Sequence, residues 1–134
     1  MCSGDKIMRI IFLMIVLFVL LKFNISSSQN LYTDSLINYI NRAPDDTHKL
    51  SVLTIVIEAI SDDAIWSRYN DKLGPLSQKL MLSDNSEIKL KAQKYYSDYL
   101  NNKGYLSNNL GDIKQALDYF IQSLKIQEKI GDMT

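Results

Sequence analysis

The chain has few of the residues on which most enzymatic and metal chemistry depends. Its 134 residues include one cysteine, Cys2, and one histidine, His48. A zinc or iron site needs several such ligands, so these two residues cannot assemble one, and a disulfide framework is also excluded. The sequence has no glycine-rich phosphate loop, no Gly-x-Ser-x-Gly turn and no His-Glu-x-x-His pair. We therefore predict a protein that is not an enzyme and uses no cofactor or metal.

An excess of charge of either sign is also missing. Lysine and arginine together number 15, and aspartate and glutamate together number 15. A balanced chain has no overall attraction for nucleic acid, so we expect no nucleic-acid partner. The acidic pairs Asp45-Asp46 and Asp62-Asp63 could be imagined as catalytic carboxylates, but each precedes an apolar segment where a helix needs a capping side chain. We predict that both pairs cap helices.

The chain has a single long apolar run, which lies near its N-terminus. Ile10 to Leu21 is an unbroken stretch of twelve apolar residues with basic residues on both sides. As a helix it would rise about 18 Å, short of the roughly 30 Å hydrocarbon core of a bilayer and within the range of about 7–15 residues that is typical of signal peptides. Small residues follow at Ser26 to Ser28. We predict that residues 1–28 insert in or cross the membrane during export, either as a signal peptide cleaved before Gln29 or as a lasting signal anchor. The protein would then be periplasmic, or anchored in the membrane and facing the periplasm.

The remaining apolar residues recur at three- and four-residue steps from Gln29 onward, which predicts an all-α body. We expect helices at about residues 48–60, from about 61 to 80, at 87–108 and at 113–129. The first has a β-branched centre, Val52 to Ile57, that would also suit a strand. In the second, Gly74-Pro75 predicts either a kink or the start of a separate helix. The apolar spacing assigns one face of this second helix to Ile65, Trp66, Tyr69, Leu73, Leu76 and Leu80.

The segment from Leu100 to Ile130 carries the most specific pattern in the chain. Its two expected helices are joined by Leu110-Gly111-Asp112, with Asp112 positioned to cap the second helix. Two small residues, Gly104 and Ala116, lie where the helices would cross. The frame reads Leu100-x-x-Lys103-Gly104-x-x-Ser107, then Ala116-x-x-x-Phe120 and Ser123-Leu124-Lys125-Ile126. This segment resembles a tetratricopeptide repeat, a helix–turn–helix unit of about 34 residues. It departs from the family pattern at Lys103, Ser107, Ser123 and Glu128, which stand where the family usually has Leu, Tyr, Ala and Pro. The alternative is an ordinary two-helix piece of another α-bundle.

The resemblance implies a short α-solenoid of antiparallel helical hairpins, because such units stack on one another. Residues 97–130 would form the well-made repeat, and residues 29–96 a divergent helical region with a degenerate hairpin. Residues 131–134 would begin a truncated next repeat. The apolar side of the last helix would remain uncovered, which makes self-association through that helix possible.

The resemblance also implies a function and a set of residues for it. The first helix of each hairpin lines a groove that holds peptides in repeats of this family. The groove residues would be Asp98, Asn101, Tyr105 and Asn108, on the face opposite the packing residues, although a simply solvated face gives the same pattern. The residues that define the repeat by their packing would be Leu100, Gly104, Ala116 and Phe120.

We therefore predict an exported, non-catalytic scaffold that binds a peptide or protein partner. The alternative is the N-terminal sensor fragment of a larger bacterial signalling protein that contains tetratricopeptide repeats and crosses the membrane. Such a protein would be of the histidine-kinase or cyclase type, and its output domain is missing from this sequence.

Overall fold

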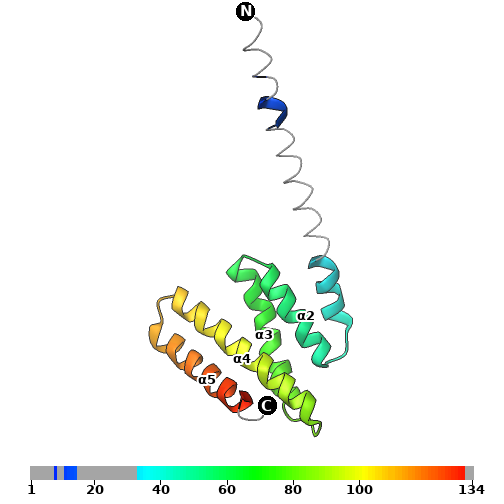
Figure 1. Cartoon of the computed structure of the whole chain (residues 1–134), viewed down its shortest axis with the longest axis vertical. Coiled ribbons are helices and arrows are strands. Elements are labelled where there is room, and N and C mark those ends of the chain that lie inside the picture. Colours follow the sequence, from blue (N-terminus) through cyan, green and yellow to red (C-terminus); the bar gives the residue numbers. More distant parts are fainter. Residues whose placement is uncertain (1–7, 9–10, 15–32, 132–134) are drawn as a thin grey trace, which may run out of the picture. The chain divides into compact units, whose positions relative to one another are not determined.

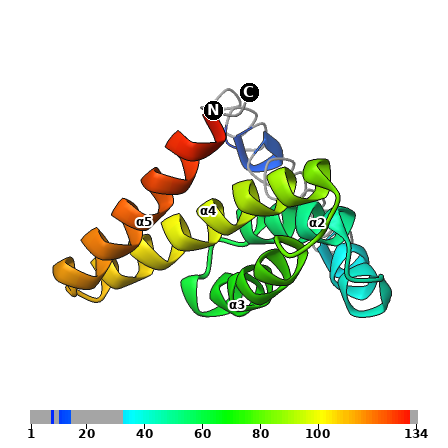
Figure 2. The ribbon, with the colours of Figure 1, turned by 90° about the horizontal axis from the view of Figure 1, so that it is seen from below.

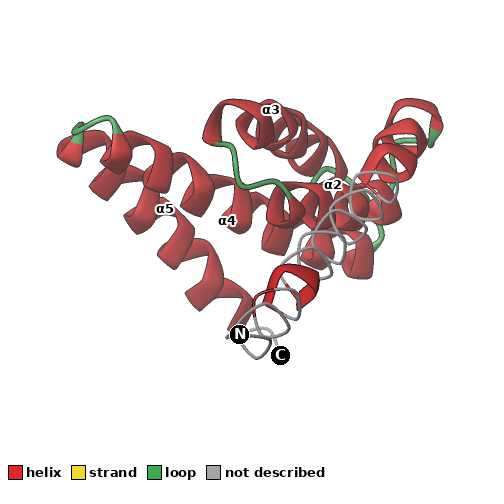
Figure 3. Cartoon of the chain, turned by 90° about the horizontal axis from the view of Figure 1, so that it is seen from above, coloured by secondary structure: helices red, strands yellow, loops and turns green. Residues whose placement is uncertain are grey.

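The computed structural model describes Met8, residues 11–14 and residues 33–131. Within these ranges the chain is helical between short turns and contains no strand, as Figure 3 shows. The predicted all-α class is thus confirmed. The chain divides into two compact units, Met1–Leu36 and Ile37–Thr134, and the four complete helices all lie in the second unit.

The predicted export segment, residues 1–28, lies outside the described residues except for Met8 and residues 11–14. The start of a next repeat, predicted at residues 131–134, lies outside them except for Gly131. A search of the described helices found none with the length and apolar character needed to cross a membrane.

Helix α2 spans Thr47–Ala59 and agrees closely with the expected helix. It begins where Asp46 caps it, with one carboxylate oxygen accepting a hydrogen bond from the Lys49 amide at 2.9 Å. Its β-branched centre does not form a strand, because Val52 and Val56 are buried on the inner side of the helix. Tertiary packing therefore overrides the local preference.

Helix α3 spans Asp63–Leu80 as one helix that contains Pro75. The expected continuation of the helix through Gly74-Pro75 is therefore confirmed, and the alternative of a separate helix beginning at Pro75 is wrong. Asp62 caps its start, as predicted, by accepting hydrogen bonds from two amides of the first turn. The predicted buried face is also partly wrong, because Ile65 is 45% exposed while the polar residues Asn70 and Ser77 are fully buried.

Helices α4 (Ser86–Asn109) and α5 (Ile113–Gly131) form an antiparallel hairpin. Gly111 turns the chain between them with φ of +80°, a conformation that glycine adopts without steric cost. Asp112 then accepts a hydrogen bond from the Gln115 amide at 3.0 Å, which confirms its predicted capping role. Figures 1 and 2 show that the two helices meet at this turn and diverge toward their other ends.

The core of this unit lies between α2, α3 and α4. Helix α4 packs against α3 on one side and α5 on another, and it also contacts α2. The largest fully buried aliphatic side chains lie before α4 in the chain: Ile40, which precedes α2, Leu50, Leu53 and Val56 of α2, and Leu73 of α3. Helix α5 fully buries only Ala116 and Ser123, so it covers α4 mainly with small residues and leaves most of its larger apolar side chains exposed.

Candidate interaction site

Helix α4 carries the predicted groove residues along one side. Asn101 and Asn108 are exposed, Tyr105 is 50% exposed and Asp98 is half-buried. All four lie outside the buried layer of α4, which consists of Ala92, Ser97, Leu100, Gly104 and Ser107. The helix therefore presents a polar strip that packing leaves accessible.

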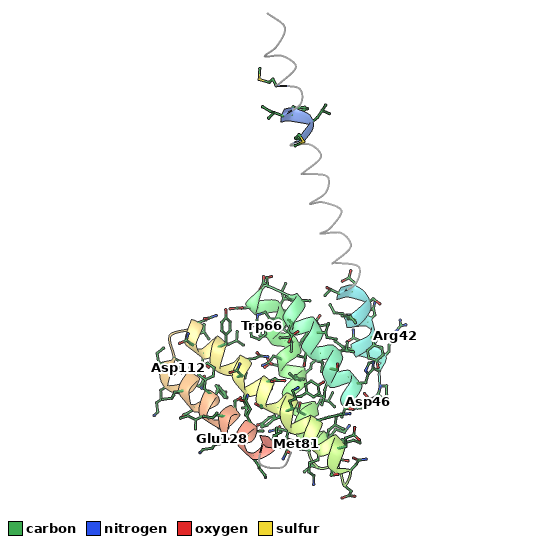
Figure 4. The ribbon with its side chains drawn as sticks, in the orientation of Figure 1. Arg42, Asp46, Trp66, Met81, Asp112 and Glu128 are labelled. Carbon is green, nitrogen blue, oxygen red and sulfur yellow. The ribbon has the colours of Figure 1, made fainter. Side chains whose placement is uncertain are left out.

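Tyr105 borders an aromatic and acidic cluster at the start of α3. Its ring centre lies 6.1 Å from that of Trp66, with the planes tilted by 42°. The indole Nε1 of Trp66 donates a hydrogen bond to Asp63 at 2.8 Å, and the Asn109 side chain donates to the other carboxylate oxygen at 3.0 Å. In Figure 4 Trp66 projects from the first turns of α3. Asp63 thus connects α3 to the last turn of α4. From the sequence, only a capping role was predicted for the Asp62-Asp63 pair.

Asp98 is the ionisable group of the strip whose environment is most altered. Partial burial raises the pKa of its carboxyl, the positive charge of Lys94 opposes this, and the negative charge of Glu58 in α2 adds to it. No hydrogen bond to this carboxylate occurs among the described residues. The negative charge of Asp98 is therefore not fully balanced by neighbouring groups, and a cationic group of a ligand would stabilise the charged carboxylate.

A close glycine contact positions α4 against α5. Gly104 is buried, and a Cβ added to it would lie 2.6 Å from Cε1 of Phe120. Leu100 and Ala116 are buried as predicted, whereas Phe120 is 38% exposed because it covers Gly104 at the edge of the interface. Gly104, Ala116 and Phe120 thus lie where these two helices pack together, and Leu100 is buried in α4.

A polar layer continues the same interface. The hydroxyls of Ser97 and Ser123 lie 2.9 Å apart, and Ser123 also donates to the Ser97 carbonyl at 2.9 Å. Gln127 donates to the Ser97 hydroxyl at 2.9 Å. From the sequence, Ser123 was noted as a departure from the repeat pattern, and the role of Ser97 was not predicted. The available signal was that Ser97 lies three residues before Leu100 and seven before Gly104, on the buried face of the same helix.

Amide side chains make the corresponding connection between α3 and α4. Asn70, which is fully buried, donates to the carbonyl of Tyr99 at 3.3 Å and accepts a hydrogen bond from Asn102 at 2.9 Å. Gly74 lies beside this pair, where an added Cβ would be 2.7 Å from the Tyr99 ring. Tyr96 and Tyr99 stack with ring centres 5.6 Å apart. These tyrosines therefore pack between helices, and the burial of Asn70 was not predicted from the sequence.

The remaining concave feature near this strip is a cleft of about 470 Å³ between the start of α3 and the end of α4. Leu106 and Leu110 contribute its main apolar groups, and its polar lining consists of Asp63, Ser67, Asp71, Lys103, Ser107, Asn109 and Gln115. Among the described residues, no three histidine, cysteine, aspartate or glutamate side chains are grouped so that they could hold a metal ion. The strip and the cleft can bind a ligand through hydrogen bonds, charge and apolar contact.

Comparison of the chain with family models, with curated proteins and with solved structures gave no match. The arrangement of its own residues is therefore the basis for a functional proposal.

Proposed function

We propose that this protein is an exported, non-catalytic scaffold that resembles a tetratricopeptide-repeat protein and binds an extended peptide segment of a partner. In this proposal α2–α3 and α4–α5 are successive hairpins of a short solenoid. Helices α2 and α4 are then the first helices of their hairpins and line the peptide groove.

The helix contacts support this order of stacking. Helix α4 contacts its own partner α5, the preceding second helix α3 and the preceding first helix α2. Gly74 and Gly104 lie under Tyr99 and Phe120 at two successive helix crossings, where backbones that approach closely need a residue without a side chain. Stacked hairpins that contact only their neighbours have this pattern of contacts.

The accessible polar strip of α4 is the observation that carries the proposed binding. Asn101 and Asn108 each offer a carbonyl acceptor and an amide donor, which can pair with the backbone of an extended chain. Tyr105, which is 50% exposed and packs against the buried Trp66, supplies apolar contact beside them. The half-buried Asp98, with Glu58 nearby, favours a peptide that contains lysine or arginine.

An array of short random peptides tests the proposal when it is probed with the full chain. We expect peptides rich in basic residues to be retained, and titration of a retained peptide to change the fluorescence of Trp66, the only tryptophan. The variant with both Asn101→Ala and Asn108→Ala should lose this binding. The matched control is Gln122→Ala, an exposed amide on α5. Binding that is unaffected by the paired asparagine change, or absent for every peptide, would reject the groove.

Export is a separate part of the proposal and has its own test. The apolar run from Ile10 to Leu21 and the small residues at Ser26 to Ser28 support it. We expect N-terminal sequencing of the protein recovered from the periplasm to begin at Gln29. A chain that is recovered only from the cytoplasm, with its N-terminus intact, would contradict export.

A further inference from the structure

Helix α5 carries an apolar stripe that no described part of the chain covers. Ile113, Leu117, Ile121 and Leu124 are respectively 62%, 56%, 41% and 53% exposed. Their spacing of four, four and three residues places them on one side of the helix, next to the side that packs on α4. Single exposed apolar residues are ordinary, but a continuous stripe of this kind marks an interaction surface.

Four charged residues run beside this stripe and identify what fits it. They are exposed, they alternate in sign along the helix, and none makes an ion pair within the described chain: Lys114, Asp118, Lys125 and Glu128. At about 100° per residue, Lys114, Asp118 and Lys125 lie on the flank of the stripe that points away from α4, and Glu128 lies at the C-terminal end of the stripe itself. A surface that carries both signs in this order is complementary to a reversed copy of itself.

We infer that α5 pairs antiparallel with α5 of a second copy of this chain, about a twofold axis at Ile121. Residues equally far before and after the axis then face each other, because a twofold interface is self-complementary. Lys114 lies seven residues before Ile121 and Glu128 seven after it, so each meets the other across the axis. Asp118 lies three residues before the axis and Lys125 four after it, and Leu117 lies four before and Leu124 three after, so each of these pairs is neighbouring with an offset of one residue.

The charges also exclude the nearest alternative alignment. If the axis moved toward the N-terminus by between one and two residues, Lys114 would face Lys125 of the other copy, and two pairs of like charges would oppose each other. The alignment on Ile121 instead forms two copies each of a Lys114–Glu128 and an Asp118–Lys125 pair.

The size of the stripe sets the strength of the association. Four aliphatic side chains that are about half exposed make a patch on the order of 500 Å² for each copy, or roughly 1,000 Å² in total. That is the lower limit of specific interfaces, so the dimer forms and dissociates with concentration rather than being permanent. It does not depend on peptide binding, because α4 and its polar strip are not part of this interface.

Disulfide trapping in the full chain tests the position of the axis. In a Cys2→Ser background, Ile121→Cys places two thiols at the axis, and mild oxidation should give a covalent dimer on a non-reducing gel. The matched control is Gln122→Cys, which lies on the opposite side of α5 from Leu117 and should remain monomeric. Equal trapping at both positions, or no trapping of Ile121→Cys, would overturn the inference.

Charge reversal tests the antiparallel alignment independently. Lys114→Glu places like charges at both symmetry-related contacts and should weaken dimerisation by about tenfold. Adding Glu128→Lys restores opposite charges and should return the dissociation constant to near its original value. Sedimentation velocity of the full chain measures the dissociation constants of both variants. Density-matched detergent keeps the apolar N-terminal run in solution, and this run is the same in every variant. If the double variant is as weak as the single one, while circular dichroism shows unchanged helicity, the alignment is wrong.

Discussion

Phe120 lies directly over Gly104, so that a Cβ on the glycine would come within 2.6 Å of the phenylalanine ring. This contact brings the backbone of α4 close to a side chain of α5 and explains why the two helices cross near their connecting turn. The same relationship links Gly74 of α3 to Tyr99 of α4. Two successive interfaces are therefore built on one principle, in which a missing side chain makes room for an aromatic ring.

Gly104→Leu should destabilise the α4–α5 hairpin. The new side chain would displace Phe120 and push the helices apart, at a cost of about 1–3 kcal/mol in the free energy of unfolding, as is typical of overpacking. Urea denaturation followed by circular dichroism measures the change. Asn101→Leu is the control, because it adds the same side chain at an exposed position of the same helix. Equal stability of the two variants would show that the contact with Phe120 is not a constraint.

Ser97→Ala and Ser123→Ala should not have additive effects. Each single change leaves a buried hydrogen-bonding group of the partner without its closest hydroxyl, at a cost of about 1–2 kcal/mol. The double change removes both groups together, so its cost should fall below the sum of the two. The four free energies of unfolding form a double-mutant cycle, and a coupling energy near zero would contradict the proposed polar layer.

Gly111→Ala should destabilise the protein by about 1 kcal/mol, because the residue has φ of +80° and a Cβ there strains the backbone. An added Cβ would meet no atom within 4 Å, so the effect is confined to the backbone conformation. Gly111→Asn should cost less, since asparagine adopts this conformation more readily than alanine. Thermal melts of the three proteins would reveal the order, and equal melting of the alanine and asparagine variants would contradict this explanation.

Asp98→Asn should raise thermal stability at neutral pH. Burial raises the pKa of Asp98 in the folded protein above its ordinary 3.8, so the folded state disfavours the charged carboxylate. That penalty is fully present above the folded pKa, shrinks as the pH falls through it, and is absent below the unfolded value. The difference in melting temperature between the variant and the original protein should therefore decline as the pH is lowered toward 3.8.

Helix boundaries were the part of the fold that could be predicted well from the sequence. Asp46, Asp62 and Asp112 each cap a helix as expected, because a carboxylate before an apolar segment satisfies amides of the first turn. The interior of the interfaces was less visible. Asn70 and Ser97 are polar residues whose burial depends on hydrogen bonds to other helices, and a partner distant in sequence leaves no local pattern.

The candidate site divides in the same way. The polar strip of α4 was predicted from helical spacing together with the resemblance to a tetratricopeptide repeat, and three of its four residues are exposed. The residues that surround the strip could not be predicted from the sequence, because Trp66 and Glu58 belong to two other helices. Packing between helices decides which residues meet, and spacing within one helix cannot report it.

The serine layer between α4 and α5 has a consequence for how the last helix can turn about its own axis. Apolar contacts alone would tolerate a rotation of α5 that buried Leu117 in place of Ser123, since aliphatic side chains fit many apolar surfaces. Such a rotation would strip Ser97 of its hydroxyl partner and leave it unsatisfied in the interior. The polar contact therefore fixes the rotation of α5 about its own axis. It keeps the apolar stripe of α5 exposed to solvent, where another molecule can reach it.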